Sequence, residues 1–246
     1  MINRRRYKNP PIQEALVEFQ FAGSEEGDVT VFGELYALLK AKYPTKRVRH
    51  SVEHAIHVSP QGPVPLPPRS GIDRVQFLSA DGTELVAIGV NVLSTHRLRP
   101  YTGWDKFSPR IAEALDWYRQ VAGSPGVSRI GVRYINTLDC AQGLKSLNEL
   151  LSIPVGLPSG FPDNLASFLM RFEARYDDRR RLLLTLARAP GESFGVVVDF
   201  DVIFQAAEGE PLGFDDALGE AEQLRDLERE AFELAITDTA RETFDA

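Results

Sequence analysis

The chain has 246 residues, of which 43% are hydrophobic and 26% charged, and its formal net charge is −7 at pH 7. A chain of this length and composition can bury a substantial globular core, and its acidity disfavours broad, nonspecific binding to phosphate backbones. Its single cysteine excludes an intrachain disulfide, and no apolar run approaches the 18 residues expected of a membrane span, so we expect a cytoplasmic protein without a membrane partner.

The first half of the chain predicts a strand, a helix, three strands and a second helix. After a flexible basic arm at residues 1–8, apolar and polar residues alternate through 14–21, which is typical of a strand. Asp28 can cap a helix that Pro44 ends. The remaining elements are strands at 47–59, 73–80 and 84–97, a Pro-rich loop at 60–71, a turn at Asp81-Gly82 and a helix within 103–123.

The second half predicts a similar order of elements. We expect a strand at 127–139, a short helix at 144–153, a Pro/Gly loop at 154–164, strands at 165–176, 180–189 and 194–206, and a long helix at 214–244. The two halves therefore read as pseudo-repeats, about 10–123 and 127–244, within one domain spanning 1–246.

Each predicted unit alone would leave open sheet edges, so we expect the two sheets to join edge to edge. The predicted fold class is α+β, with pseudo-duplicated strand-helix-three strands-helix units that form one curved antiparallel sheet with helices on one face. This is the saddle topology of the TATA-binding-protein type. The analogy concerns topology and transfers no function.

Charged residues alternate with apolar ones on the predicted central strands. If the first strands of the two halves pair, Glu14 and Glu18 share the solvent-facing side of the sheet with Arg129 and Arg133. Opposite charges on neighbouring strands stabilise pairing by about 0.2–1 kcal/mol each. We predict that this face binds a protein partner or a small charged ligand. Its residues are Glu14, Glu18, Arg129, Arg133, Arg171, Glu173, Arg175, Asp199 and Asp201.

Three stretches of the chain resemble a known family. They are NPPIQEALVEF at 9–19, RIGVRYIN at 129–136 and AFELAITDTARETF at 231–244, accompanied by Trp104 and Phe107. Together they resemble an uncharacterised, sporadically distributed bacterial family with a Pro-Pro-Ile-x-Glu-Ala start. The resemblance implies a bacterial cytoplasmic protein, and its sporadic distribution would suit a mobile or defence-related gene cassette. It supplies no catalytic residues.

Few residues suggest catalysis. Asp199 and Asp201 could hold Mg²⁺ on one face of a strand, although paired carboxylates are also ordinary solvated charge. No cofactor motif is present, and we expect none to be bound. Several aromatic residues could line a ligand groove but more often belong to the core or its rim. They are Tyr7, Phe77, Tyr101, Trp104, Phe168 and Phe172. The charged face of the last helix is expected to face solvent or a partner helix.

These patterns favour a non-enzymatic binding or interaction module, either monomeric or as a homodimer. The alternative is a metal-dependent enzyme that acts on phosphorylated or nucleotide substrates through Asp199 and Asp201. A second alternative is nucleic-acid binding by the saddle face, which interleaved acidic residues disfavour.

Overall fold

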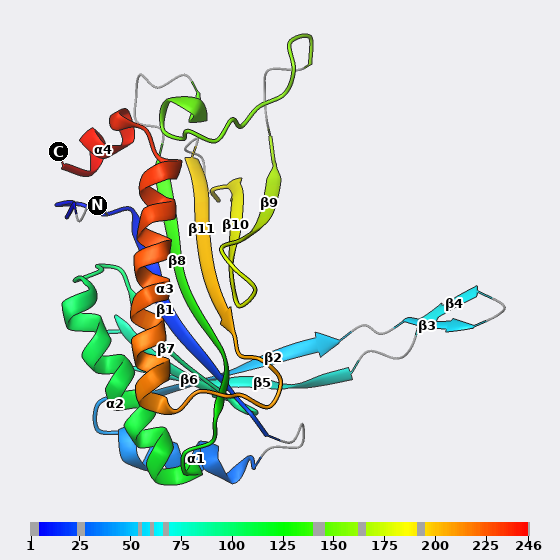
Figure 1. Cartoon of the computed structure of the whole chain (residues 1–246), viewed down its shortest axis with the longest axis vertical. Helices are drawn as coiled ribbons and strands as arrows, with labels where there is room; N and C mark the ends of the chain where they lie inside the picture. Colours follow the sequence, from blue (N-terminus) through cyan, green and yellow to red (C-terminus); the bar gives the residue numbers. More distant parts are fainter. Residues whose placement is uncertain are drawn as a thin grey trace.

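The computed structural model describes residues 5–23, 28–53, 56–59, 62–65, 69–139, 146–161, 166–190 and 195–245, with side chains outside 51–72. The described chain has an α+β fold in which nine strands form one large, open, antiparallel sheet accompanied by four α-helices (Figure 1). None of these helices combines the length and apolar character needed to pass through a lipid bilayer.

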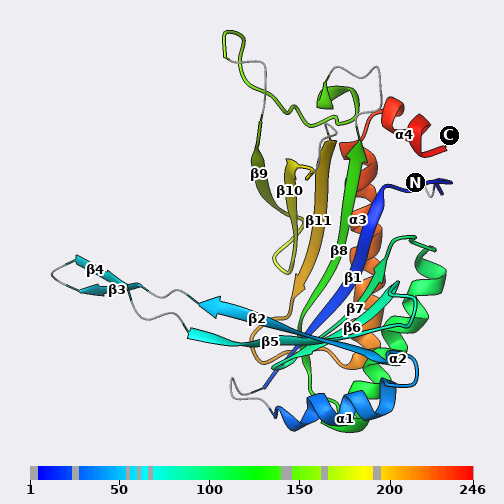
Figure 2. The same cartoon turned by 180° about the vertical axis from the view of Figure 1, so that it is seen from behind.

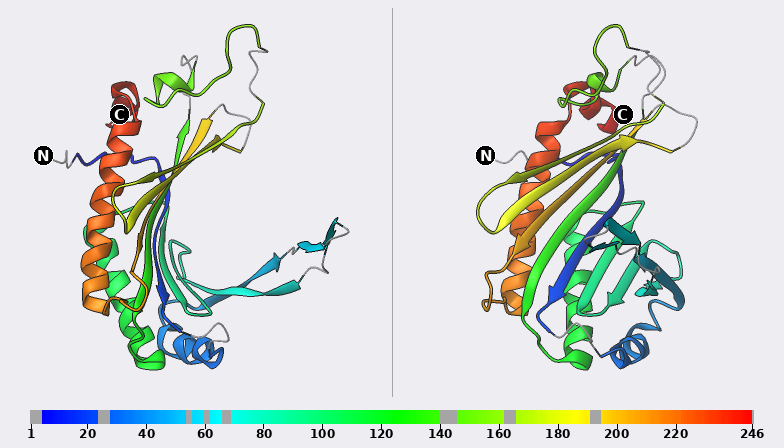
Figure 3. Two further views of the ribbon diagram at one scale, coloured as in Figure 1. Left: turned by 45° about the vertical axis from the view of Figure 1, so that its right-hand side comes forward. Right: turned by 90° about the vertical axis from the view of Figure 1, so that its right-hand side faces the viewer.

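The large sheet has the order β2-β5-β6-β7-β1-β8-β11-β10-β9. Its strands are β1 (Ile12–Phe21), β2 (Thr45–Glu53), β5 (Arg69–Leu78), β6 (Glu84–Gly89), β7 (Val92–Leu98), β8 (Val127–Asp139), β9 (Leu169–Arg175), β10 (Arg180–Arg188) and β11 (Gly195–Gln205). A small separate hairpin of β3 (Ile56–Ser59) and β4 (Gly62–Pro65) lies beyond the ends of β2 and β5 (Figure 2). The sheet is bent, because β2 and β5 reach away from the upright strands (Figure 3).

The two longest helices lie on one side of the sheet. They are α2 (Trp104–Ala122) and α3 (Phe214–Ala235), and both run behind the strands in Figure 2. The helix α1 (Thr30–Leu39) packs against α2 at one end of the molecule, and α4 (Asp238–Asp245) follows α3 at the other. We call the opposite side of the sheet, which faces away from α2 and α3, the open face.

The first strands of the two halves, β1 and β8, pair in the middle of the sheet. Val17 lies opposite Val132 and Phe19 opposite Ile130, and each of these side chains is at most 1% exposed. They form the centre of the main core with residues of all three longer helices. Because successive side chains of a strand point to opposite faces, Glu18 and its alternate neighbours project to the open face.

The segment 84–97 is a hairpin rather than the single predicted strand. β6 and β7 meet at a tight turn in which Asn91 has a φ of 52°, a left-handed conformation that asparagine tolerates better than most residues. Five consecutive residues of β6 are buried. The sequence therefore shows no alternation of polar and apolar residues there that could mark where the strand ends.

The Pro-rich stretch 60–71 was predicted as a loop, but it contains β4 and the start of β5. Pro63 and Pro65 lie opposite Val58 and Ile56 in the small hairpin. A two-stranded hairpin consists only of edge strands, which are the strands that accept residues lacking an N–H donor.

The predicted helix at 144–153 is a single 3-10 turn, Leu147–Glu149, within the residues described there. The predicted helix at 214–244 is interrupted between α3 and α4, where Ile236 is extended and forms an isolated bridge with Leu151. The Thr237 hydroxyl then accepts the N–H of Ala240 in the first turn of α4. Long-range pairing therefore replaces helix at both places.

Part of the predicted flexible arm is held against the helices, while residues 1–4 lie outside the described residues. The Tyr7 ring packs edge-on against Phe232 and Phe244, with centroid separations of 6.4 and 5.3 Å. Its hydroxyl donates to Glu233 over 2.9 Å, and the N–H of Asn9 donates to the carbonyl of Phe244. These contacts attach the arm to α3 and α4.

Candidate functional site

Glu18 lies at the centre of an ionic network on the open face. Its carboxylate contacts the guanidinium of Arg74 on β5 at 2.9 Å and that of Arg129 on β8 at 3.2 Å. All three side chains are mostly buried. Three strands are therefore joined at one acidic residue that the alternation of β1 directs to this face.

Arg133 and Asp199 form the second pair that the structure brings together. The guanidinium of Arg133 donates two hydrogen bonds to the carboxylate of Asp199, over 2.8 and 2.6 Å. This bidentate geometry is the strong form of an arginine–carboxylate pair. It joins β8 to β11.

Glu14 pairs with a histidine that the sequence did not single out as a site residue. The Nδ1 atom of His96 lies 2.5 Å from the Glu14 carboxylate, and its Nε2 lies 2.8 Å from the hydroxyl of the buried Ser94. Burial pushes the pKa of Glu14 upward, but the hydrogen bond and charge of His96, with the charge of Arg133, hold it below its usual value. Glu14 is thus an ionised partner within the sheet.

Asp201 differs from the other acids because no hydrogen bond to its carboxylate is found among the described residues. Burial is the main cause that raises its pKa to about 6, against the opposing charges of Arg129 and Arg133. Gly131 makes room for it: a methyl group at that position would lie 3.3 Å from Asp201 Oδ1.

This network is nearly self-neutralised. Both oxygens of Asp199 accept hydrogen bonds from Arg133, so the pair Asp199 and Asp201 does not present two free carboxylates to a cation. Across the described residues, no group of three His, Cys, Asp or Glu side chains is placed to hold a metal ion. The arginines alternate with acids, so they form no continuous cationic surface for nucleic acid.

Arg171, Glu173 and Arg175 lie apart from this network, on β9 at the edge of the sheet. The register places Arg171 opposite Thr185, which in turn lies opposite Asp199, so a whole strand separates the two charged side chains. All three β9 residues are exposed. The predicted binding face is therefore divided into a sheltered central network and an exposed edge.

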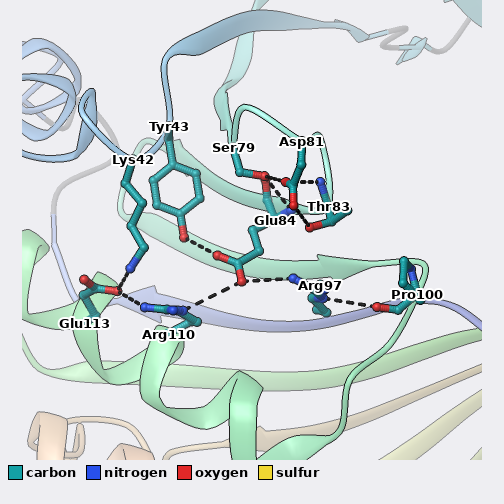
Figure 4. Close-up of polar contacts among 10 residues, drawn as sticks. All are labelled: Lys42, Tyr43, Ser79, Asp81, Thr83, Glu84, Arg97, Pro100, Arg110 and Glu113. Atoms are coloured by element: carbon teal, nitrogen blue, oxygen red, sulfur yellow. Dashed lines mark hydrogen bonds and ion pairs between the residues drawn. The ribbon is translucent and has the colours of Figure 1, made fainter.

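A third polar cluster is centred on Glu84 (Figure 4). Glu84 accepts a hydrogen bond from Tyr43 at 3.3 Å and one from Arg97 at 3.0 Å, and it lies 3.7 Å from Arg110. Glu113 joins Arg110 to Lys42. The cluster connects the corner after α1 to the sheet and α2, and each of its charges faces an opposite one. We interpret it as structural.

The helix side contains a cavity of about 280 Å³ beneath the N-terminal arm. Tyr134 of β8 and Tyr101 reach it, and their hydroxyls share a hydrogen bond of 2.9 Å. Burial raises the pKa of Tyr101 to about 12. All three stretches that carry the family resemblance contribute to its wall, through Pro10–Ile12, Tyr134 with Asn136, and Phe232.

The six aromatic residues that could line a groove have different positions. Tyr7, Tyr101 and Trp104 line the cavity. Phe77 belongs to the main core, Phe168 packs against a second core cluster, and Phe172 is exposed on β9. The sequence could identify these residues as aromatic but not their depth.

The prediction of a solvent-facing charged side on the last helix is wrong for two of its acids. Glu220 and Glu228 are 7% and 5% exposed. Arg180 of β10 donates two hydrogen bonds to Glu220, over 2.6 and 2.7 Å. Glu228 lines the cavity. The available signal was spacing, because both acids lie four residues from the buried Leu224 on the apolar stripe of the helix.

A scan against protein-family models finds no match, and a comparison with curated proteins finds no significant similarity. The family resemblance therefore stays a prediction.

Proposed function

We propose that the protein is a non-enzymatic binding module whose exposed sheet edge, β9, pairs with an extended segment of a protein partner. One observation carries the proposal: β9 ends the sheet and is exposed along both of its faces. Leu169 is 73% and Phe172 43% exposed. An exposed edge that keeps apolar side chains is a template for strand addition.

The backbone of β9 offers a regular row of hydrogen-bonding groups on its outer side. Tyr176 donates its N–H to Arg180 and Phe168 accepts from Arg188, so the even-numbered residues of this strand are directed toward β10. In an antiparallel pair the alternate residues point the other way. The N–H and C=O groups of Leu169, Arg171 and Glu173 therefore face outward.

The side chains of β9 suggest the partner's chemistry. On the open face, the charges of Arg171, Glu173 and Arg175 alternate in sign. On the helix side, Phe172 presents an apolar surface. A matching segment would carry acid, base and acid at alternate positions and apolar residues between them. In this proposal the central network around Glu18 fixes strand register, and β9 makes the contact.

The decisive test is photo-crosslinking in the native host, with a benzophenone amino acid at Leu169 and identification of the crosslinked segment by mass spectrometry. Glu173→Pro removes one outward N–H and leaves the bonds to β10 intact, so it should abolish the crosslink. Glu173→Ala is the matched control, because it loses the same side chain and keeps the N–H. A crosslink that survives Glu173→Pro, or none at all, would overturn the proposal.

A crosslink to a second copy of this chain would make the partner strand another β9 and the assembly a homodimer. Light scattering of the purified protein distinguishes this outcome from binding of a different protein. Only pairing of β9 with β9 of a second copy gives a dimer that Glu173→Pro dissociates. Either partner is consistent with strand addition, and the two differ in the mass of the crosslinked peptide.

We infer further that the sheet derives from a duplicated unit with saddle topology. The sheet order supports this, because β1 is followed outward by β7, β6, β5 and β2, and β8 by β11, β10 and β9. In each half the later strands lie in reverse chain order. Among the described residues, the halves differ by one strand of the large sheet, by the β3–β4 hairpin and by α1, in whose place the second half has a 3-10 turn. Bacterial origin and a cytoplasmic location also stay proposals.

A further inference from the structure

The cavity on the helix side has a buried acid that the fold does not use. Glu228 is 5% exposed, yet within the described parts of the chain its carboxyl group makes no hydrogen bond. No side-chain nitrogen or oxygen of the described residues is both fully buried and without a partner, so the carboxyl oxygens of Glu228 are open to the cavity. Their hydrogen bonds must come from water or from a ligand in the cavity, because an unsatisfied carboxyl is costly to bury.

The groups around Glu228 determine what state it takes without a ligand. Burial is the main cause that raises its pKa to about 8, although Arg225 and Arg229 of the same helix oppose the shift. Tyr134 from the sheet, Tyr101 from the segment before α2 and Tyr176 from the β9–β10 turn also lie within electrostatic reach. At neutral pH the unliganded acid is therefore mostly protonated.

The walls of the cavity are aromatic. Tyr7, Tyr101, Trp104 and Phe232 all line it. Flat heterocycles stack favourably on such rings. The cavity of about 280 Å³ lies just below the usual range for drug-sized ligands, which suits a mononucleotide better than a dinucleotide.

Five cationic side chains line the cavity and its mouth, those of Arg5, Arg6, Lys8, Arg225 and Arg229. Three of them are paired with acids: Arg5 with Asp245, Arg6 with Asp105 and Arg225 with Asp226. Arg6 pairs with Asp105 in a contact where both side chains are largely exposed, and such a surface pair is weak enough for a phosphate to displace the acid. An anionic tail at the mouth would thus meet arginines, while the head group meets Glu228.

We propose that this cavity binds a mononucleotide whose base presents two adjacent N–H donors, as guanine does, to the carboxylate of Glu228, with its phosphate at the arginine-lined mouth. A carboxylate is an acceptor only and can receive two parallel N–H groups. Adenine offers one N–H donor beside an acceptor nitrogen, so it fits the carboxylate of Glu228 less well than guanine does. The site lies on the side of the sheet opposite the open face and stands independently of the β9 proposal.

Binding through ionised Glu228 has a pH signature. The ligand must displace the proton, so affinity should rise by up to about tenfold per pH unit until the pH reaches the pKa of about 8. A protonated Glu228 that donates to an adenine nitrogen would instead lose affinity as the pH rises. The two assignments therefore predict opposite trends.

The experiment is isothermal titration calorimetry of the full chain with GMP, AMP and inorganic phosphate, at about pH 6.5 and about pH 8. We expect GMP to bind more tightly than AMP, more tightly at the higher pH, and about tenfold or more weakly in Glu228→Gln. Glu222→Gln, an exposed position on the same helix, should leave binding unchanged. Circular dichroism establishes that both variants fold.

Four outcomes would overturn the proposal. The first is no heat with GMP up to about 1 mM at either pH. The second is AMP binding as tightly as GMP, and the third is GMP binding that Glu228→Gln leaves intact. The fourth is inorganic phosphate binding as tightly as GMP, which would reduce the site to its cationic mouth.

Discussion

Arg133 and Asp199 form a diagonal pair across two strands. The register of β8 and β11 places Arg133 directly opposite Asp201. Its guanidinium instead extends diagonally and donates both hydrogen bonds to Asp199, two residues from Asp201 on β11. Asp201 is left beside the arginines without a hydrogen bond among the described residues, and its pKa rises to about 6. Two neighbouring acids on one strand thus have different roles.

Replacing Arg133 by methionine should destabilise the protein by about 2 kcal/mol, because Asp199 is only 13% exposed and would lose two charge-assisted hydrogen bonds. Methionine preserves the apolar stem, so packing is retained. Urea denaturation measures the change. Arg179→Met is the control: its pair with Glu210 is about half exposed, and the expected loss is below about 0.5 kcal/mol. Equal effects of the two substitutions would contradict the assignment.

Asp201 should make the protein less stable as the pH rises. Its folded pKa of about 6 exceeds the ordinary value of 3.8, so its contribution is fully present below about pH 4 and lost as the pH passes through 6. Asp201→Asn removes this dependence. The variant should gain stability relative to the parent between pH 4 and pH 7, by at most about 3 kcal/mol. Urea denaturation across that range measures the difference, and a constant difference would refute the shift.

Glu84 should be a structural residue. Glu84→Gln keeps the size of the side chain but leaves the mostly buried Arg97 without a carboxylate, so we expect a loss of about 1–3 kcal/mol in the free energy of unfolding. Asp116→Asn, in an exposed pair with Arg119, is the control and should change stability by less than about 0.5 kcal/mol. A loss no larger than that of the control would show that the cluster in Figure 4 does not stabilise the fold.

The sequence predicted the open-face residues because a strand has a strict period of two. Once Val17 and Val132 are assigned to the core, Glu18 and Arg133 must lie on the other side. It could not predict which arginine meets which acid. Register shifts near both ends of β1, and the diagonal reach of Arg133, depend on the three-dimensional path of the strands.

The cavity was harder to foresee. Glu228 reads as one more charge on a charged helix, yet it is buried and lines a cavity with an N-terminal arm more than 200 residues away in the chain. The break at Ile236 has a similar cause, because a bridge to Leu151 replaces local helix propensity. Local patterns carry no information about such distant partners.

The hydroxyls of Tyr101 and Tyr134 should depend on each other. Tyr134→Phe leaves the partly buried hydroxyl of Tyr101 without its partner at 2.9 Å, which should cost about 1–2 kcal/mol. Tyr101→Phe should cost a similar amount. The double variant should be less destabilised than the sum of the two, because no hydroxyl is then left unpaired. A double-mutant cycle by urea denaturation, without added ligand, measures this coupling. Additive losses would show that solvent in the cavity already satisfies each hydroxyl and that the pair contributes no coupling energy.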